Sequence, residues 1–435
     1  MRMWARSLVL ILLVGGIPAA QQAPPPRPAP AAGPESVGIS SERLGRLHRG
    51  MQAFVDRREA GGIVTLIGRN GKVVDVNASG FQDVDSHTAM RTDTIFRIAS
   101  MSKPITSVAV MMLYEEGKLL LTDPVSKFIP AFKGQRVIVE GGSTVPARRD
   151  ITIRDLLSHR SGLSYGFLNA GPVGDAYRKE GVTDGLTVTS LTLEQGINKL
   201  AAQPLVAQPG AEWNYSLSVD VLGRVVEVAS GSSFDVFLRD RIFKPLGMTD
   251  TGFEVPDAKW ARMATVYSPD AAGAIRPMKD PESFGNTHMS PVASYKAPKR
   301  YFSGGAGLTS TAGDYARFAQ MLLNGGTLDG VRLLGPKTIE LMTASHTADL
   351  PAGGLIGPGA NFGLGFRVVM DVAATQTEGS PGMYGWLGIY GTSFWVDPKE
   401  RLIAIMMVQR FPGGTVGDSF QTLVYQALTK SASVP

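Results

Sequence analysis

A serine and a lysine three residues apart, Ser100 and Lys103, are the side chains whose types and spacing most directly indicate catalysis. On a helix this spacing places both side chains on one face, within hydrogen-bonding distance of each other. A serine at a helix N-terminus lies at the positive end of the helix dipole, which favours developing negative charge. A lysine in apolar surroundings can accept or relay a proton near neutral pH, because desolvation disfavours its ammonium form. The pair is equally consistent with a helix cap beside a solvated lysine.

The element that must position this pair is a predicted helix from Ser102 to Glu116, which ends at Gly117. Its sequence is apolar nearly all round, a pattern typical of a helix that runs through a core and not along a surface. Pro104 is tolerated because it falls in the first helical turn. The lysine is therefore expected to be surrounded by apolar side chains.

The first folded elements are predicted to be a helix and a pair of antiparallel strands. Ser41 can cap the helix, and two strands, 63–67 and 73–76, flank Asn70-Gly71. This dipeptide is a strong hairpin signal, because a tight primed turn needs positive φ at both central residues.

Composition along the chain predicts a discontinuous fold. Helical patterns dominate from about residue 150 to 345, and strand patterns return near Phe362. The first 20 residues carry two Arg, an apolar run and small residues before Gln21, which is typical of an export signal. An uncleaved membrane anchor is the alternative. The predicted organisation is a signal peptide (1–20), a Pro/Ala-rich linker (21–38), an α/β domain (39–150 and 346–435) and a mainly helical domain (151–345).

The overall composition argues against several functional classes. The chain has 435 residues and a formal net charge of only +5, and it contains no run of five or more basic residues. A nucleic-acid partner is therefore not expected. The absence of Cys excludes thiol catalysis, disulfide bonds and Cys-ligated zinc. The five His form no close pair, so a His-built metal site is not predicted. No other feature of the sequence implies a metal or an organic cofactor.

Further motifs occur in a fixed order along the chain. They are Ile98–Pro104 (IASMSKP), Leu156–Leu163 (LLSHRSGL), Trp213–Leu217 (WNYSL), Gly304–Thr311 (GGAGLTST) and Phe362–Phe366 (FGLGF). Together they resemble the serine β-lactamase and penicillin-binding-protein-like superfamily over nearly the whole mature chain. Within it, the chain most resembles the class C β-lactamase-related esterases called family VIII carboxylesterases. The resemblance implies an α/β fold in which an antiparallel sheet is flanked by helices, with an inserted all-helical domain and the site between the two.

The resemblance also implies a role for each matching residue. Ser100 is the expected nucleophile and Lys103 its proton partner. Tyr215 is the expected base, which activates Ser100 and later the hydrolytic water. A nearby ammonium such as that of Lys103 would stabilise a phenolate. The backbone N–H groups of Ser100 and Ile389 are expected to form the oxyanion hole.

Two departures from the lactamase pattern bear on the substrate. Leu217 stands where lactamases and peptidases of this superfamily usually have Asn. Trp386-Leu387-Gly388 stands where they carry a Lys/His-Thr/Ser-Gly strand. Without that cation a substrate carboxylate loses its counter-charge, whereas an uncharged acyl group gains by burial against Trp386. Leu217, Trp386 and Gly388 are therefore predicted pocket residues, although Trp386 is also consistent with packing alone. Loops around 166–190 and 270–300 are expected to shape the same pocket.

Three other features have simpler explanations. Gly162–Gly166 fits the G-x-S-x-G pattern of the α/β-hydrolase nucleophile elbow, but the segment before Ser164 is predicted to be a helix and not a strand. His159 is interpreted as a structural histidine. Asp220, with Arg224 and Glu227, is predicted to belong to one solvated or locally paired helix face.

The sequence therefore predicts an exported, periplasmic or secreted serine hydrolase. It would cleave small neutral carboxylic esters through a covalent acyl-enzyme on Ser100, with a small-molecule ester as partner and no stable membrane insertion after signal cleavage. A β-lactamase or D-alanyl-D-alanine carboxypeptidase of the same fold is the nearest alternative. An acyltransferase would use the same residues, and a non-catalytic cell-envelope binding protein is an alternative of another class.

Overall fold

The predicted hairpin starts the central sheet. The computed structural model describes residues 33–284, 287–296, 298–351 and 354–432. In it, β1 (Gly62–Arg69) and β2 (Lys72–Asp83) pair antiparallel. Asn70 and Gly71 have φ angles of +53° and +76°, so the turn between the strands has the primed geometry that the dipeptide predicts.

Strands from both ends of the chain form one antiparallel sheet. Among the described residues it has eight strands in the order β14-β15-β16-β17-β18-β1-β2-β3. The C-terminal β18 pairs with the N-terminal β1, from Ile63 opposite Val408 to Arg69 opposite Leu402. The other strands are β3 (Thr88–Ala89), β14 (Ala360–Phe362), β15 (Arg367–Val369), β16 (Tyr384–Leu387), β17 (Ser393–Asp397) and β18 (Leu402–Val408). The predicted fold class is confirmed.

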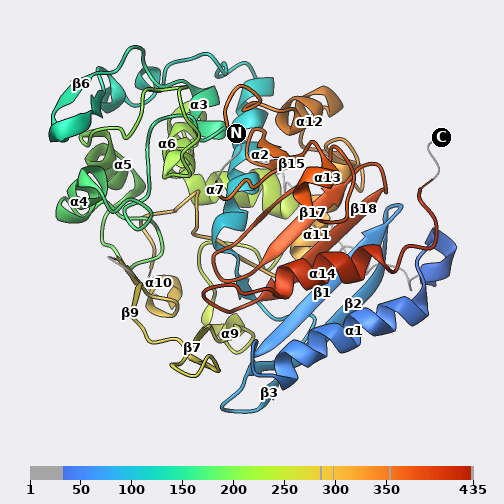
Figure 1. Ribbon diagram of the computed structural model, residues 1–435. Helices are drawn as coiled ribbons and strands as arrows, with labels where there is room; N and C mark the ends of the chain where they lie inside the picture. Colours follow the sequence, from blue (N-terminus) through green and yellow to red (C-terminus); the bar gives the residue numbers. More distant parts are fainter. Residues whose placement is uncertain (1–32, 285–286, 297, 352–353, 433–435) are drawn as a thin grey trace, which may run out of the picture. The chain divides into compact units, whose positions relative to one another are not determined.

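The two faces of this sheet are covered by different helices (Figure 1). Alternate residues of β18 enter different cores, as a period of two requires. Leu402 and Met406 pack with α1 (Ser41–Asp56) and α14 (Val416–Tyr425). Ile403 and Ile405 enter the larger core on the opposite face, where α11 (Ala312–Leu323) lies against β1, β17 and β18.

Two predictions at the N-terminal end need correction. The cap of α1 is Ser40, not Ser41, because the Ser40 hydroxyl accepts the Arg43 N–H at 3.3 Å. The predicted linker is also too long at its C-terminal end. Pro34–Val37 forms a 3-10 helix, η1, and Val37 is buried in the sheet core. The signal-peptide prediction and residues 21–32 of the linker lie outside the described residues.

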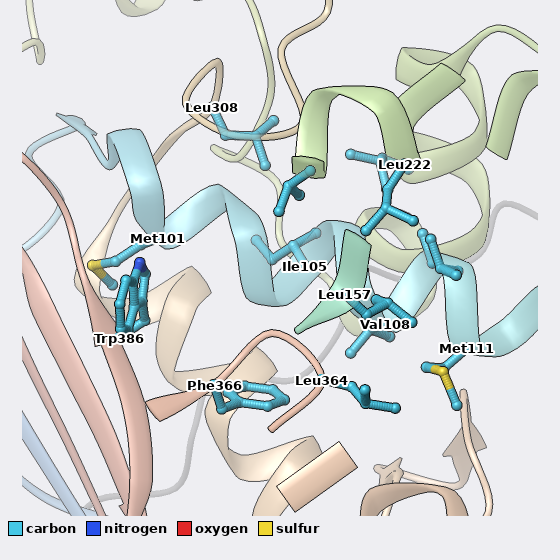
Figure 2. Close-up of a cluster of buried hydrophobic side chains, with 14 of the residues drawn as sticks. Met101, Ile105, Val108, Met111, Leu157, Leu222, Leu308, Leu364, Phe366 and Trp386 are labelled. Carbon is cyan, nitrogen blue, oxygen red and sulfur yellow. The ribbon is translucent and has the colours of Figure 1, made fainter. Parts of the chain in front are cut away.

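The predicted central helix is α2 (Ser102–Glu115), and residues 102–113 are all buried. It packs against α6 (Ser218–Ser230), which follows the motif of Tyr215. Figure 2 shows Ile105, Val108 and Met111 of α2 among side chains from distant segments, with Trp386 of β16 beside Met101. An all-round apolar helix thus forms the centre of the larger core.

The remaining elements are short. Among the described residues of 151–345 there are also three small hairpins, which the prediction of a mainly helical segment did not include. They are β7 (Tyr267–Pro269) with β8 (Ile275–Pro277), β9 (Glu282–Phe284) with β10 (Thr287–Met289), and β12 (Thr327–Leu328) with β13 (Val331–Arg332). The described residues all fall in one compact unit, so the predicted boundaries at 150 and 345 remain predictions.

The other helices are α3 (Ile153–Leu157), α4 (Pro172–Lys179), α5 (Leu193–Ala201), α7 (Phe234–Leu238), α8 (Lys244–Leu246), α9 (Asp257–Trp260), α10 (Ala293–Lys296), α12 (Pro336–Thr343) and α13 (Val372–Thr375). A π-helical turn (Arg239–Phe243) and 3-10 turns (Val125–Lys127, Pro130–Phe132, Glu140–Gly142) join them. The short strands are β4 (Phe96–Arg97), β5 (Arg136–Ile138), β6 (Thr144–Pro146), β7 (Tyr267–Pro269), β8 (Ile275–Pro277), β9 (Glu282–Phe284), β10 (Thr287–Met289), β11 (Thr309–Ser310), β12 (Thr327–Leu328) and β13 (Val331–Arg332).

Candidate active site

Ser100 lies in a 3-10 turn, η2 (Ala99–Met101), that leads directly into α2. The residue before it, Ala99, is fully buried and has a φ of +41°, a left-handed conformation that is unfavourable for a residue with a Cβ. The Ser100 side chain is half-buried, whereas Lys103, one turn further, has no exposed surface. The three-residue spacing thus places the partly exposed Ser100 hydroxyl one helical turn before the buried Lys103 amine.

The Lys103 amine contacts three oxygens. Its Nζ lies 3.1 Å from Ser100 Oγ, 2.9 Å from Tyr165 Oη and 2.8 Å from the Gly305 carbonyl oxygen. Burial lowers the pKa of Lys103, because the ammonium is desolvated, and the charge of Asp220 opposes this effect. As an ammonium, Lys103 donates to all three oxygens. As a neutral amine, it can keep two N–H groups on Gly305 and Tyr165 while its lone pair faces the Ser100 hydroxyl.

Tyr215 completes the predicted trio. Its hydroxyl oxygen accepts the indole N–H of Trp386 at 3.3 Å, and Lys103 Nζ lies 4.5 Å from its ring centroid. Burial raises the pKa of Tyr215, and hydrogen bonds with Ser100 and Trp386 only partly offset this. Tyr215 is therefore a neutral phenol at rest. The phenolate expected from the sequence is therefore not the resting form.

The Trp386 and Leu217 side chains are more enclosed than the sequence predicts. Trp386 is 4% exposed, and its ring packs on Tyr215 and Phe362 with centroids 5.5 and 5.2 Å away. Leu217 is 1% exposed and belongs to the larger core, so its side chain is not part of an exposed pocket wall. Trp386 combines an apolar ring with a hydrogen-bond donor aimed at Tyr215.

Gly388 lets the end of β16 approach the nucleophile turn. A Cβ at this position would lie 2.4 Å from the Ile98 carbonyl oxygen and 2.3 Å from Thr392 Oγ1. The next residue, Ile389, is half-buried. Neither its backbone N–H nor that of Ser100 donates to a backbone carbonyl among the described residues, so both remain available for the predicted oxyanion hole.

The sequence gives no signal for Tyr165, which lies inside the Gly162–Gly166 motif. The side chain of this motif that contacts Lys103 is the tyrosine and not the serine. Tyr165 is 3% exposed and accepts a hydrogen bond from Lys103, whereas Ser164 Oγ donates to the Tyr165 carbonyl oxygen at 3.5 Å. The segment before Ser164 contains α3, so the strand that a nucleophile elbow requires is missing.

The prediction that His159 is structural agrees with its surroundings. Its Nδ1 lies 3.2 Å from Ser216 Oγ, and its ring packs against Tyr215 at 4.9 Å. Burial, reinforced by the charge of Lys103, holds the pKa of His159 well below its usual value, so the ring stays neutral.

The prediction for Asp220 is wrong, because this residue does not lie on a solvated face. It has no exposed surface. Arg224 pairs instead with Glu227 at 3.0 Å and with Glu194 at 2.7 Å. The signal that could have identified Asp220 is its place between Val219 and Val221, directly after the Tyr215 motif.

An apolar cluster surrounds the backbone of the site. Half-buried Phe167 and Ile389 pack on it, and Phe167 stacks on Tyr165 with centroids 4.8 Å apart. The cluster consists of Ala99, Leu186, Val266, Met278, Met289, Ala306, Tyr390 and Phe411. Several members come from the two loop regions that the sequence predicts to shape the pocket. Among the described residues, no three His, Asp or Glu side chains are grouped as a metal site would need.

Comparison with known proteins agrees with this geometry. A family model described as beta-lactamase matches residues 47–427. The chain belongs to the beta-lactamase family. The resemblance inferred from the ordered motifs is confirmed.

Several known proteins are similar to this chain over most of their length. Esterase EstB of Burkholderia gladioli is 33% identical over 373 residues, which are 84% of this chain and 90% of EstB. An Escherichia coli K12 protein whose name proposes a D-alanyl-D-alanine carboxypeptidase is 30% identical, over 88% of this chain and 86% of its own. The structure of "EstCE1, a hydrolase with promiscuous acyltransferase activity" superimposes with a TM-score of 0.77 at 34% identity, over 88% of this chain and 98% of EstCE1.

Proposed function

We propose that this protein is a serine carboxylesterase of the family VIII type, which hydrolyses small neutral esters through an acyl-enzyme on Ser100. The observation that carries the proposal is the hydrogen bond of Lys103 to Ser100 Oγ at 3.1 Å, inside a core that disfavours the ammonium. The similarity to EstB, named as an esterase, and to EstCE1, named as a hydrolase, supports the choice of substrate class.

In the acylation step, Lys103 accepts the Ser100 proton while Oγ forms a bond to the ester carbonyl carbon. The N–H groups of Ser100 and Ile389 stabilise the oxyanion that develops. When the intermediate collapses, the bond to the alkoxide breaks, and the neutral phenol of Tyr215 gives that alkoxide its proton. The alcohol then leaves, and the site contains a Lys103 ammonium and a Tyr215 phenolate.

In the deacylation step, the Tyr215 phenolate takes a proton from water, and the hydroxide attacks the acyl carbon. The bond to Ser100 Oγ breaks, and Lys103 returns its proton to that oxygen. The phenolate exists only between these two steps. There it is stabilised by the Lys103 ammonium and by the N–H of Trp386, which lies 3.3 Å from its oxygen.

Neutral esters are the proposed substrates because of the residues beside the nucleophile. Trp386 stands where a lactamase-type strand has a cation, and half-buried Phe167 and Ile389 add apolar surface. An uncharged acyl or alcohol group gains by covering such surface, at roughly 25 cal/mol per Å². A carboxylate gains no counter-charge from the 386–388 segment.

Steady-state hydrolysis of p-nitrophenyl acetate, butyrate and octanoate, beside nitrocefin, tests this proposal. We expect fast turnover of the short esters, little cleavage of nitrocefin, and loss of turnover to background in Ser100→Ala. Ser164→Ala is the matched control and should keep most of the activity. Loss of activity in Ser164→Ala with retention in Ser100→Ala would contradict the assignment.

A peptidase or lactamase of the same fold is a second candidate, favoured by the similarity to the Escherichia coli protein. It predicts rapid acylation of Ser100 by penicillins or cephalosporins, together with weak ester cleavage. Intact-mass measurement after incubation with benzylpenicillin distinguishes the two. A stable adduct that is absent from Ser100→Ala would favour the second candidate.

We also propose that the protein is exported to the periplasm or secreted. The arginines, apolar run and small residues of positions 1–20 support this. No helix among the described residues combines the length and apolar character needed to cross a membrane. Cell fractionation with N-terminal sequencing tests the proposal, and a cytoplasmic product that keeps Met1 would contradict it.

A further inference from the structure

The carboxylate of Asp220 is buried near Lys103, the proposed proton acceptor. Asp220, on α6, has no exposed surface. Neither carboxylate oxygen makes a hydrogen bond of normal geometry among the described residues. Burial raises the pKa of Asp220 to about 6, and the Ser303 hydroxyl, the charge of Lys103 and the Gly305 N–H oppose this rise. A buried carboxylate without a compensating charge is costly, so its surroundings must supply one.

Gly305 joins this carboxylate to Lys103. A Cβ at Gly305 would lie 2.5 Å from Asp220 Oδ2 and 3.0 Å from Tyr165 Oη. The carbonyl oxygen of the same residue accepts the Lys103 N–H at 2.8 Å, and Tyr165 Oη lies 2.9 Å from Nζ. Asp220 and Lys103 thus both lie against Gly305, and a side chain at position 305 would collide with the Asp220 carboxylate.

Among the titratable groups around Asp220 and Lys103, Lys103 is the one whose positive charge can compensate the Asp220 carboxylate. Tyr165, Tyr301 and Asp184 face Asp220, and burial keeps both tyrosines protonated by raising the pKa of each. Tyr215 and His159 face Lys103; burial raises the pKa of Tyr215 and lowers that of His159, so both are neutral at rest. Asp184 carries the same charge sign as Asp220. Lys103 is the cation that acts on Asp220 within the described residues.

We propose that Asp220 is a positioning residue that supplies the buried counter-charge of Lys103 and so sets the pH range in which Lys103 can accept the Ser100 proton. This inference rests on the proposed function, in which Lys103 is the first proton acceptor. Asp220 itself touches neither the substrate nor the reacting atoms. It acts through the charge of Lys103.

The charges of Asp220 and Lys103 determine in which direction the pH profile of acylation moves. Lys103 must be neutral to accept a proton, so acylation becomes faster as the pH rises through the pKa of Lys103. The carboxylate of Asp220 favours the ammonium and keeps that pKa higher than burial alone would. Removing the carboxylate charge therefore moves the acidic limb of the rate profile to lower pH. An opposite charge at close range typically shifts a pKa by about one to three units.

The experiment compares Asp220→Asn with Asp314→Asn across pH 5 to 10. Asp314 is a matched control, because it is another buried carboxylate, 8% exposed, whose partners are the Asp250 N–H and the Thr251 hydroxyl. The measurements are kcat/KM for p-nitrophenyl butyrate and the rate of Ser100 phosphonylation by a fluorophosphonate, followed by intact mass. In that labelling the Oγ–P bond forms, fluoride leaves and Lys103 takes the proton.

We expect Asp220→Asn to move the midpoint of the acidic limb down by about one pH unit in both measurements. Asp314→Asn should leave the midpoint in place. An unmoved or raised midpoint in folded Asp220→Asn would overturn the proposal, because a purely structural role changes the rate at every pH without displacing the midpoint.

Ser303→Ala provides the test if Asp220→Asn does not fold. It removes the hydroxyl that favours the charged form of Asp220 and should shift the midpoint in the same direction by less. An unmoved midpoint there would also count against the proposal. Labelling of wild-type Ser100 without ester turnover would refute the proposed esterase and leave this test intact. Ester turnover with an unmoved midpoint would refute only the role of Asp220.

Discussion

At the scale of single residues, Trp386 combines an apolar ring with a hydrogen-bond donor that contacts Tyr215. Its indole has no charge to offer a substrate carboxylate. It nevertheless gives Tyr215 a hydrogen bond, at 3.3 Å, and it packs against the same ring. The sequence predicts the apolar ring but not the hydrogen bond, because the direction of the indole N–H depends on the folded chain. Substitution can separate the effect of the ring from the effect of the donor.

Replacing Trp386 by Phe keeps an aromatic ring and removes the donor. Forming the Tyr215 phenolate, when the phenol protonates the leaving alkoxide, then loses a hydrogen bond to a charged oxygen, which is worth about 1.5–3 kcal/mol, and this step becomes slower. We expect kcat for p-nitrophenyl butyrate to fall about 10- to 100-fold while KM changes little. Stopped-flow and steady-state measurements with this ester give both values.

A second tryptophan provides the control for this substitution. Trp395, on β17, is 6% exposed and packs on Phe420 on the opposite face of the sheet. Trp395→Phe should leave kcat unchanged. If Trp386→Phe raised KM with an unchanged kcat, the tryptophan would be a pocket wall alone.

At the scale of elements, the sequence predicts the structures that have local signals. The Asn70-Gly71 turn and the all-apolar helix α2 follow from turn geometry and hydrophobic patterning. Ser100 and Lys103 share one turn of chain, so their contact is predictable as well. Tyr165 and Asp220 reach Lys103 only through the packing of separate segments. No local pattern marks them, and the helical spacing of Asp220 with Arg224 even indicates a solvated face.

The end of β16 illustrates a constraint that only the packed elements reveal. Gly388→Ala places a Cβ 2.4 Å from the Ile98 carbonyl oxygen, a separation that folded proteins do not tolerate, so the strand end must move away. Ile389 moves with it and withdraws its N–H from the oxyanion. We expect kcat to fall about 10²- to 10³-fold, as for the loss of one oxyanion donor. Ester kinetics on the folded variant measure this.

A glycine without such contacts serves as the comparison. Gly313, in α11, has only Thr311 Oγ1 near the position of an added Cβ, at 3.9 Å. Gly313→Ala should leave kcat unchanged and should not destabilise the helix, since alanine is the better helix former. Equal kinetics for the two alanine variants would show that the β16 end does not position an oxyanion donor.

At the scale of the whole molecule, one buried arginine joins segments from both ends of the chain. Arg69, at the end of β1, is 1% exposed and donates five hydrogen bonds. They go to the carbonyl oxygens of Val37, Gly38, Glu400 and Lys430 and to the Glu400 carboxylate, at 2.7 to 3.1 Å. The antiparallel pairing of β1 with β18 brings these segments together, and Arg69 satisfies the polar groups that meet there.

Replacing Arg69 by Met removes all five donors and leaves the Glu400 carboxylate buried without its partner. Breaking a buried pair from one side typically costs about 3–5 kcal/mol, so we expect a loss of that size in the free energy of unfolding, measured by urea titration. Arg46→Met is the matched control, because the Arg46–Glu42 pair is 51% and 79% exposed and should contribute less than about 1 kcal/mol. No partner of Arg69 belongs to the active site, so kcat/KM at 25 °C should stay within about twofold. A loss below about 1 kcal/mol in Arg69→Met would mean that the sheet alone holds the ends of the chain together.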